Sequence, residues 1–244
     1  MDNPWIELIE NWNKNGRFSV SPDQPVIDRF NSNSFRTPKS EDLFRIHDEV
    51  LPYPFTGNIK KASVILLATN PGFVEKEKDT LYSCESFHQE VRDNLMFNSE
   101  KFLNEDEKRR EYSDYWHKRT RKLSEDVGDI NKVLHGIALL QFFPYHSKRF
   151  RKISRKYFDN KEDSYLITQK FNFYLLEQAI ENKKLIIITR GKRYWYEAVK
   201  KLSSYKKEEK RVLELKNYQQ PYITRRNFAG EGDYDKVIEE LKKL

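Results

Sequence analysis

The segment from Ala62 to Phe73 constrains the fold of this chain more than any other. Residues 64–68 are apolar at five successive positions, which is typical of a strand buried on both faces of a parallel sheet. The strand must end in the turn at 69–72, because proline cannot join a ladder and glycine permits a tight reversal. We therefore expect Asn70 at the carboxyl end of a central strand, where open α/β sheets bind ligands.

Three later runs, which are mostly apolar, complete a sheet. They lie at 137–143, 185–189 and 211–215, and helical patterns separate them. Short apolar strands that alternate with helices imply right-handed crossovers and parallel strands. We therefore predict an α/β fold, a three-layer α/β/α sandwich with a central four-stranded parallel sheet whose carboxyl ends share one edge.

Two additions to this domain are expected. Residues 1–60 combine a helical pattern from Trp5 to Trp12 with a loop rich in Ser, Asn, Asp and Pro, so we predict an N-terminal extension packed on a domain of residues 61–244. Residues 99–126 carry charges of both signs, which favours a solvent-facing helical insertion. The alternative for this insertion is a basic, aromatic arm for nucleic acid. Its cations would be Arg109, Arg110, Lys118, Arg119 and Arg121.

The composition of the chain indicates which class of binding partner and which cellular compartment to expect. The chain has 45 Lys and Arg against 38 Asp and Glu, and the net charge of +7 favours a polyanionic partner, nucleic acid before an acidic membrane surface. Cys84 is the only cysteine, which excludes an intrachain disulfide and a cysteine-rich zinc site. The sequence has neither a signal peptide nor an apolar run of about 20 residues, so we expect a cytoplasmic protein without a membrane partner.

The carboxyl edge of the predicted sheet collects polar, basic and aromatic residues. Asn70 would meet there the segment 144–147, the turn at 190–191 and the loop 221–227. The densest unbalanced basic run of the chain, 148–156, follows the second strand directly. Such an edge suits a nucleic-acid ligand.

Residues 68–73, Ala-Thr-Asn-Pro-Gly-Phe, resemble the Gly-Ile-Asn-Pro-Gly motif of the uracil-DNA glycosylase superfamily, in its mismatch-specific uracil and thymine branch. The order of elements over residues 52–244 is similar to that fold, and 222–227 lie where the family places its DNA-inserting loop. This loop lacks the family's His-Pro-Ser or Asn-Pro-Ser signature, Gln141 stands near the usual base-reading asparagine, and no aspartate accompanies the turn. The resemblance implies a hydrolase of DNA repair that uses no metal or cofactor. It would extrude a modified or mismatched base from single- or double-stranded DNA and cleave the N-glycosidic bond.

Base removal assigns a role to each residue type at this edge. Extrusion costs a few kcal/mol, and the bond then breaks through an oxocarbenium-like sugar. The catalytic candidates are Asn70, whose carbonyl would orient water, and His146, which would stabilise negative charge on the leaving base. Phe73, Gln141 and Tyr145 are the base-binding candidates. The DNA-binding candidates, which would fill the gap or hold phosphates, are Lys148, Arg149, Arg151, Tyr222, Arg225, Arg226 and Asn227.

Each assignment has a structural alternative. Asn70 could cap its turn, Phe73 could belong to the core, Gln141 could pair with buried backbone, and His146 could be a satisfied structural histidine. The alternative function is a non-catalytic protein that binds nucleic acid or a nucleotide on the same fold. A third alternative is an enzyme that acts on a small nucleotide-like ligand. The sequence specifies neither the base nor the oligomeric state.

Overall fold

A computed structural model describes residues 1–11, 16–78, 80, 82–103 and 107–244, with only the backbone described for 107–114. The chain forms two compact units whose segments alternate along the sequence. Unit 1 comprises residues 1–54, 69–96 and 141–174, and unit 2 comprises residues 55–68, 97–140 and 175–244. A division of the chain at residue 60 therefore matches neither unit, because both units take segments from before and after that point.

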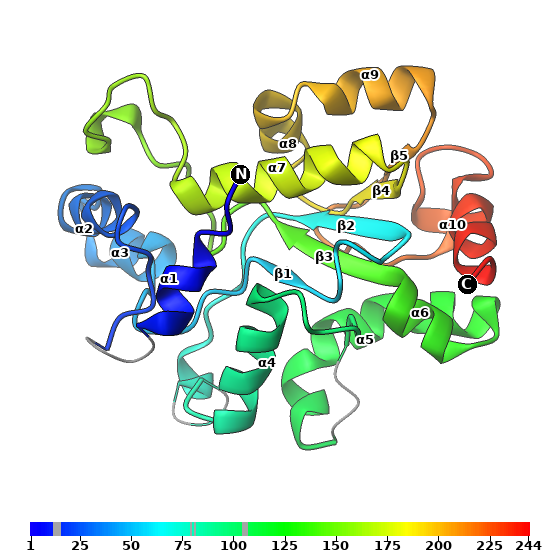
Figure 1. Ribbon diagram of the computed structural model, residues 1–244, viewed down its shortest axis with the longest axis horizontal. Helices are drawn as coiled ribbons and strands as arrows, with labels where there is room; N and C mark the ends of the chain where they lie inside the picture. The colour runs from blue at the N-terminus through cyan, green and yellow to red at the C-terminus, as the bar shows by residue number, and fades with distance from the viewer. Residues whose placement is uncertain (12–15, 79, 81, 104–106) are drawn as a thin grey trace. The chain divides into compact units, whose positions relative to one another are not determined.

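Unit 2 contains the sheet, which has five strands in the described chain (Figure 1). The strand order is β1-β3-β2-β4-β5, with β1 (Phe55–Thr56), β2 (Val64–Ala68), β3 (Ile137–Gln141), β4 (Leu185–Ile188) and β5 (Val212–Glu214). Strands β2 and β4 pair in parallel, as do β4 and β5, whereas β1 pairs with β3 antiparallel. The predicted α/β class is confirmed. The predicted count of four strands is wrong, because β1 adds a fifth strand at the edge of a mixed sheet.

The additional strand β1 is too short for a periodic pattern. Its two residues pair with Leu140 and Leu139, directly before Gly57 turns the chain at φ +77°. A Cβ on Gly57 would lie 2.9 Å from the backbone oxygen of Ile137, so glycine is required there by both φ and space. Two residues are too few to show the apolar–polar alternation of a strand, so this pairing could not be predicted from the sequence.

Both faces of the central strands are buried. One face packs against α5 (Glu107–Val127), α6 (Ile130–Gly136) and α10 (Asp233–Lys242) in a single apolar core. The alternate strand residues, such as Ile65 and Ile186, are also fully buried. On that side Figure 1 shows the second half of α7 (Ile167–Glu181), together with α8 (Lys192–Ala198) and α9 (Lys201–Glu208). Burial on both faces explains why these strands read as continuous apolar runs.

The predicted charged insertion forms one long helix, α5, that is only partly solvent-facing. Leu123 and Val127 belong to the apolar core of unit 2, and Trp116 packs against it. The prediction of a solvent-facing insertion is therefore wrong for the second half of the helix, because apolar residues on one of its faces are buried in that core. Arg109 and Arg110 have side chains outside the described residues.

Unit 1 is built from helices and long connecting loops. Its helical elements are α1 (Trp5–Glu10), α2 (Gln24–Asn33), α3 (Pro38–Phe44), the turn η1 (Glu75–Glu77), α4 (Glu85–Leu95), the turn η2 (Arg155–Tyr157) and the first half of α7. The predicted first helix is present through Glu10, and Trp12 lies outside the described residues. Of the helices that the structure describes, none is both long enough and apolar enough to cross a membrane.

Candidate functional site

The turn after β2 holds the side chain of Asn70 in one orientation. Its Nδ2 donates to the backbone oxygens of Pro71 and Ser147 and to Ser147 Oγ, each at 3.0 Å. Because a carbonyl oxygen only accepts, these bonds establish which end of the amide is nitrogen. No group among the described residues donates to Asn70 Oδ1, and the side chain is half-buried. An oriented amide oxygen is therefore left for a water or a ligand.

Ser147 ties this turn to the segment that follows β3. Its backbone N–H donates to Pro71 O at 3.3 Å, and its backbone oxygen accepts from Phe73 N at 3.2 Å. Its hydroxyl donates to the Arg149 backbone oxygen at 3.1 Å. The sequence analysis did not single out Ser147. Its position in the segment that follows the second strand, near the same sheet edge as Asn70, was the available signal.

His146 supports the same turn from the protein interior. The side chain is buried, and its Nδ1 lies 3.0 Å from the Gly72 backbone oxygen. Burial lowers the pKa of His146 to about 4, although the hydrogen bond to Gly72 favours the charged form. The ring is therefore neutral at pH 7, and Nδ1 carries its proton because the carbonyl can only accept. Nε2 is then an acceptor, so this geometry does not support a role in stabilising an anionic leaving base.

Phe73 is covered by neighbouring rings. It is 4% exposed, and the His47 ring stacks on it with centroids 3.5 Å apart and planes within 4°. Tyr82 stacks on it as well, with centroids 5.9 Å apart. Glu49 Oε1, 2.7 Å from His47 Nδ1, holds the histidine in place. An extruded base could stack on Phe73 only by displacing one of these rings, so the geometry favours the core interpretation.

The other two base-binding candidates are also buried. Tyr145 is 0% exposed, and its hydroxyl donates to Asp23 Oδ2 at 3.0 Å. Gln141 is 4% exposed, and its Oε1 is buried without a hydrogen-bond partner. Neither side chain reaches the surface, which favours structural roles for both. The unpartnered Gln141 oxygen is the one feature here that a structural role does not explain.

The basic residues after β3 are partly engaged by protein groups. Lys148 forms an ion pair with Asp42 of unit 1. Arg151 donates to the Ser34 backbone oxygen at 3.2 Å, whereas Arg149 is exposed. Of these three candidates, Arg149 is the one that the structure leaves most available for phosphate.

The remaining DNA-binding candidates belong to unit 2. Tyr222 is 38% exposed and Arg226 is also exposed, but Arg225 pairs with Asp235. Asn227 is buried and fastens its own loop, since its Nδ2 donates to the Tyr222 backbone oxygen at 2.9 Å. The structure thus brings Asn70, Phe73 and His146 together in unit 1. It places the four loop candidates in the other unit.

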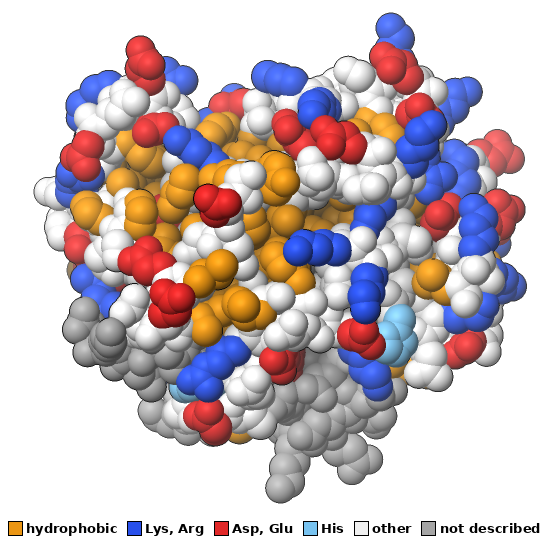
Figure 2. Space-filling view, in the orientation of Figure 1, with side chains coloured by type: hydrophobic (Ala, Val, Ile, Leu, Met, Phe, Trp, Pro, Cys, Tyr) orange, Lys and Arg blue, Asp and Glu red, His pale blue; other side chains and the backbone are white. Residues whose placement is uncertain are grey.

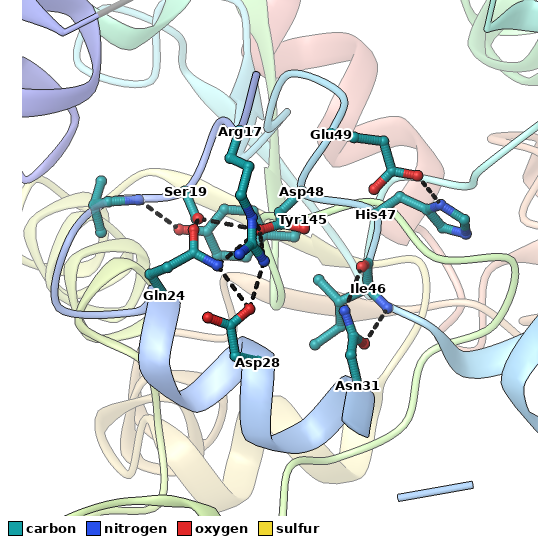
Figure 3. A network of polar contacts seen from close by, with 11 residues as sticks. Arg17, Ser19, Gln24, Asp28, Asn31, Ile46, His47, Asp48, Glu49 and Tyr145 are labelled. Atoms are coloured by element: carbon teal, nitrogen blue, oxygen red, sulfur yellow. Dashed lines mark hydrogen bonds and ion pairs between the residues drawn. The ribbon is translucent and has the colours of Figure 1, made fainter. Parts of the chain in front are cut away.

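A second polar group in unit 1 surrounds Arg17 (Figure 3). Arg17 Nε donates to Asp48 Oδ2 at 2.7 Å, and its guanidinium also pairs with Asp28. Beside this network lies a cavity of about 410 Å³, which is lined by Arg17, Asp28, Asn31, Ser32, Phe35, Glu41 and Arg45. Each arginine of the lining pairs with a carboxylate, so the cavity is polar but balanced in charge. The sequence analysis did not predict it.

Comparison with known proteins adds no assignment to this geometry. The chain matches no protein-family model, no curated protein and no solved structure. Within the described residues, no three His, Cys, Asp or Glu side chains are grouped so that they could hold a metal ion. The resemblance around Asn70 therefore stays a prediction.

Proposed function

We propose that the protein is a glycosylase-like hydrolase of nucleic acid, in which Asn70 positions the attacking water. The observation that carries this proposal is the fixed amide of Asn70, whose three Nδ2 bonds leave Oδ1 free among the described groups. An amide oxygen held in this way accepts a hydrogen bond from water and stabilises the positive charge of an oxocarbenium-like sugar, without reorganising during the reaction.

The proposed step breaks the bond between C1′ of the sugar and the nitrogen of an extruded, modified or mismatched base. The electron pair of that bond leaves with the base, and a water oxygen forms the new bond to C1′. The proton of the water passes to the solvent or to the departing base. Asn70 accepts a hydrogen bond in this step but does not take the proton, because an amide is not a base at neutral pH.

His146 acts here as a positioning residue for the turn. Its neutral ring donates to the Gly72 carbonyl, two residues after Asn70, and so supports the turn without adding a charge. This role replaces the predicted contact with the leaving base, which would require an N–H directed at the ligand.

Nucleic acid as the ligand class is supported by charge. The net charge is +7, and Arg149 is exposed two residues beyond the buried segment that ends at Ser147. On the face that Figure 2 shows, Lys and Arg side chains are interspersed with Asp and Glu, so this face carries no continuous basic field. Exposed cations such as Arg149 would supply the phosphate contacts.

The test is base release from oligonucleotides that each carry a single modified base, scored as abasic sites with and without added metal. We expect Asn70→Ala to lower the single-turnover rate by about 10²-fold or more, as removal of one preorganised polar group does. Asn182→Ala removes an exposed amide from the end of α7 and serves as the matched control. Absence of release by the wild type from every substrate, single- or double-stranded, contradicts the proposal.

The second candidate is a non-catalytic binder of nucleic acid or a nucleotide. The burial of Phe73, Gln141, Tyr145 and His146 favours it, because these residues then form the interior of a scaffold. Binding of the same oligonucleotides without release of any base would select this function over hydrolysis.

A further inference from the structure

Unit 2 carries a group of side chains that the proposed hydrolytic site does not use. We define the Tyr–Arg cluster as Tyr115 and Arg119 of α5, Arg190 after β4, and Tyr222 in the loop after β5. The guanidinium carbon of Arg119 lies 3.3 Å from the centroid of the Tyr115 ring and 5.3 Å from that of Tyr222. That of Arg190 lies 5.7 Å from the Tyr115 centroid. Three separate segments thus bring two cations and two rings together.

No carboxylate among the described residues neutralises either arginine of the cluster. Arg119 donates to the Tyr115 backbone oxygen at 2.8 Å, and Arg190 donates to the Gln219 backbone oxygen at 3.1 Å. The Nε atoms of both arginines are buried without a hydrogen-bond partner. Two like charges beside one ring repel each other, and buried donors without acceptors are unfavourable. A bound anion would offset the repulsion between the two guanidinium groups.

Other cations of the same unit are compensated by acids. Lys192 and Lys206 both pair with Glu214, whose side chain is 9% exposed, and Arg225 pairs with Asp235. These three cations differ in this respect from the two arginines of the Tyr–Arg cluster, for which the described residues supply no carboxylate.

Both rings of the cluster are exposed to solvent. Tyr115 is 37% exposed and Tyr222 is 38% exposed, and of the tyrosines with described side chains these are the two exposed ones. An exposed aromatic ring next to an arginine offers a base both a stacking surface and a cation.

The loop that carries Tyr222 is held in place before any ligand binds. Ile223 N donates to the Arg119 backbone oxygen at 2.9 Å, which ties the loop to α5. Asn227 Nδ2 donates to the Tyr222 backbone oxygen at 2.9 Å, and Asn227 Oδ1 accepts from Asn217 N at 3.0 Å. A backbone fixed on both sides of Tyr222 presents the ring without the entropic cost of ordering a loop.

We propose that the Tyr–Arg cluster is a stacking platform for single-stranded nucleic acid. Successive bases stack on Tyr115 and Tyr222, and the phosphates between them pair with Arg119 and Arg190. A single strand fits better than a duplex, because duplex bases already stack on one another and offer no face to a tyrosine. The platform shares its ligand class with the function proposed above. It uses no residue of the Asn70 turn, so binding can be present where base release is absent.

The test is the anisotropy of a labelled oligothymidylate of about 12 nucleotides, a length within the range that such platforms occupy. We expect the single strand to bind more tightly than a duplex of the same length at the same salt concentration. Tyr222→Ala should weaken binding roughly 10-fold, as expected for the loss of one stacked base, while Tyr222→Phe should bind like the wild type. Arg190→Ala should weaken binding and lower the salt slope by about 0.7.

Arg193→Ala is the matched control for charge, since Arg193 is an exposed cation of the same unit outside the cluster. It should weaken binding much less than Arg190→Ala. Three results would overturn the proposal: a duplex that binds as tightly as the single strand, a Tyr222→Ala protein that binds like the wild type, or an Arg193→Ala protein as weak as Arg190→Ala. Thermal unfolding of each variant verifies that the fold is retained.

Discussion

The Asn70 turn and the Tyr–Arg cluster differ in how far other groups of the protein compensate their polar side chains. In the turn, the amide nitrogen is fully used by protein acceptors and the neighbouring histidine is buried and neutral. In the cluster, two arginines remain charged, uncompensated by described carboxylates and beside exposed rings. The turn is a preorganised, neutral feature suited to positioning a reacting group. The cluster is a charged surface, and we propose that its cations bind phosphates.

The largest expected effect is a difference in how nucleic-acid affinity and the single-turnover rate depend on ionic strength. If about six phosphates are contacted, nucleic-acid affinity should fall by about 10³-fold or more between 50 and 200 mM salt, because bound counterions are released on association. The single-turnover rate at saturating protein should change little, since the Asn70 turn carries no net charge. Affinity is measured by anisotropy and the rate by abasic-site formation. A salt-independent affinity would indicate a small neutral ligand and remove the contrast between the two regions.

A smaller effect concerns the interior of unit 1, where Asp23 anchors α7. Its carboxylate accepts from Ile167 N at 2.8 Å, from the Thr168 hydroxyl and from the Tyr145 hydroxyl. Asp23→Ala leaves these donors without their acceptor, so we expect the free energy of unfolding to fall by about 3 kcal/mol at pH 7. Urea unfolding measures this change. An unchanged midpoint would show that the network does not stabilise unit 1.

The loss of unfolding free energy in Asp23→Ala should also depend on pH. Burial raises the pKa of Asp23 from 3.8 to about 6, so the folded protein takes up this proton before the unfolded chain does. The part of its stabilising contribution that comes from this proton is therefore complete below pH 4 and is lost as the pH rises through about 6, whereas the hydrogen bonds remain at pH 7. We expect the deficit of Asp23→Ala to be larger at pH 4 than at pH 7. His146, with its pKa lowered to about 4, acts in the opposite direction in both proteins and cancels in the difference. A deficit that shrinks on acidification would contradict this assignment.

A still smaller effect is expected at Ser147. Ser147→Ala removes one acceptor of the Asn70 amide but keeps the backbone oxygen that accepts another of its bonds. The loss of one such hydrogen bond is worth about 1 kcal/mol, so the single-turnover rate should fall by roughly 5-fold while affinity is retained. Ser203→Ala, in α9 of unit 2, is the control. A rate equal to that of the wild type would mean that the hydroxyl does not help to orient Asn70.

The smallest effect is expected at Arg225, which the sequence analysis placed among the DNA contacts. Its ion pair with Asp235 is exposed, with 64% and 44% of the two side chains accessible, and solvent screening leaves such pairs little effect on stability. Arg225→Ala should therefore leave oligonucleotide affinity within about 2-fold of the wild type, since its charge is already compensated. A loss as large as that of Arg190→Ala would extend the binding surface beyond the Tyr–Arg cluster.

The strands of this fold could be predicted because burial on both faces leaves a direct mark on the sequence. The runs around 64–68 and 185–188 are apolar at every position, and both became strands. The predicted run 137–143 continued two residues beyond β3, because Phe142 and Phe143 are buried after the ladder has ended. Apolar character reports burial, and it reports hydrogen-bonded pairing only indirectly.

The candidate sites were predictable only in part, because local patterns do not show what covers a side chain. The position of Asn70 at a strand end followed from the turn residues around it. The rings that cover Phe73 come from His47 and Tyr82, and no spacing rule connects them with it. The Tyr–Arg cluster joins residues as distant as Tyr115 and Tyr222, which only the tertiary fold brings together.

The single-turnover rate of base release by Asn70→Ala tests the central claim most directly. It is measured at saturating protein on one modified oligonucleotide, beside the wild type and Asn182→Ala. The account predicts a rate lower by about 10²-fold, an affinity within about 2-fold of the wild type, and an unchanged rate for the control. An Asn70→Ala protein that releases the base as fast as the wild type would contradict the account and leave Asn70 as a turn residue.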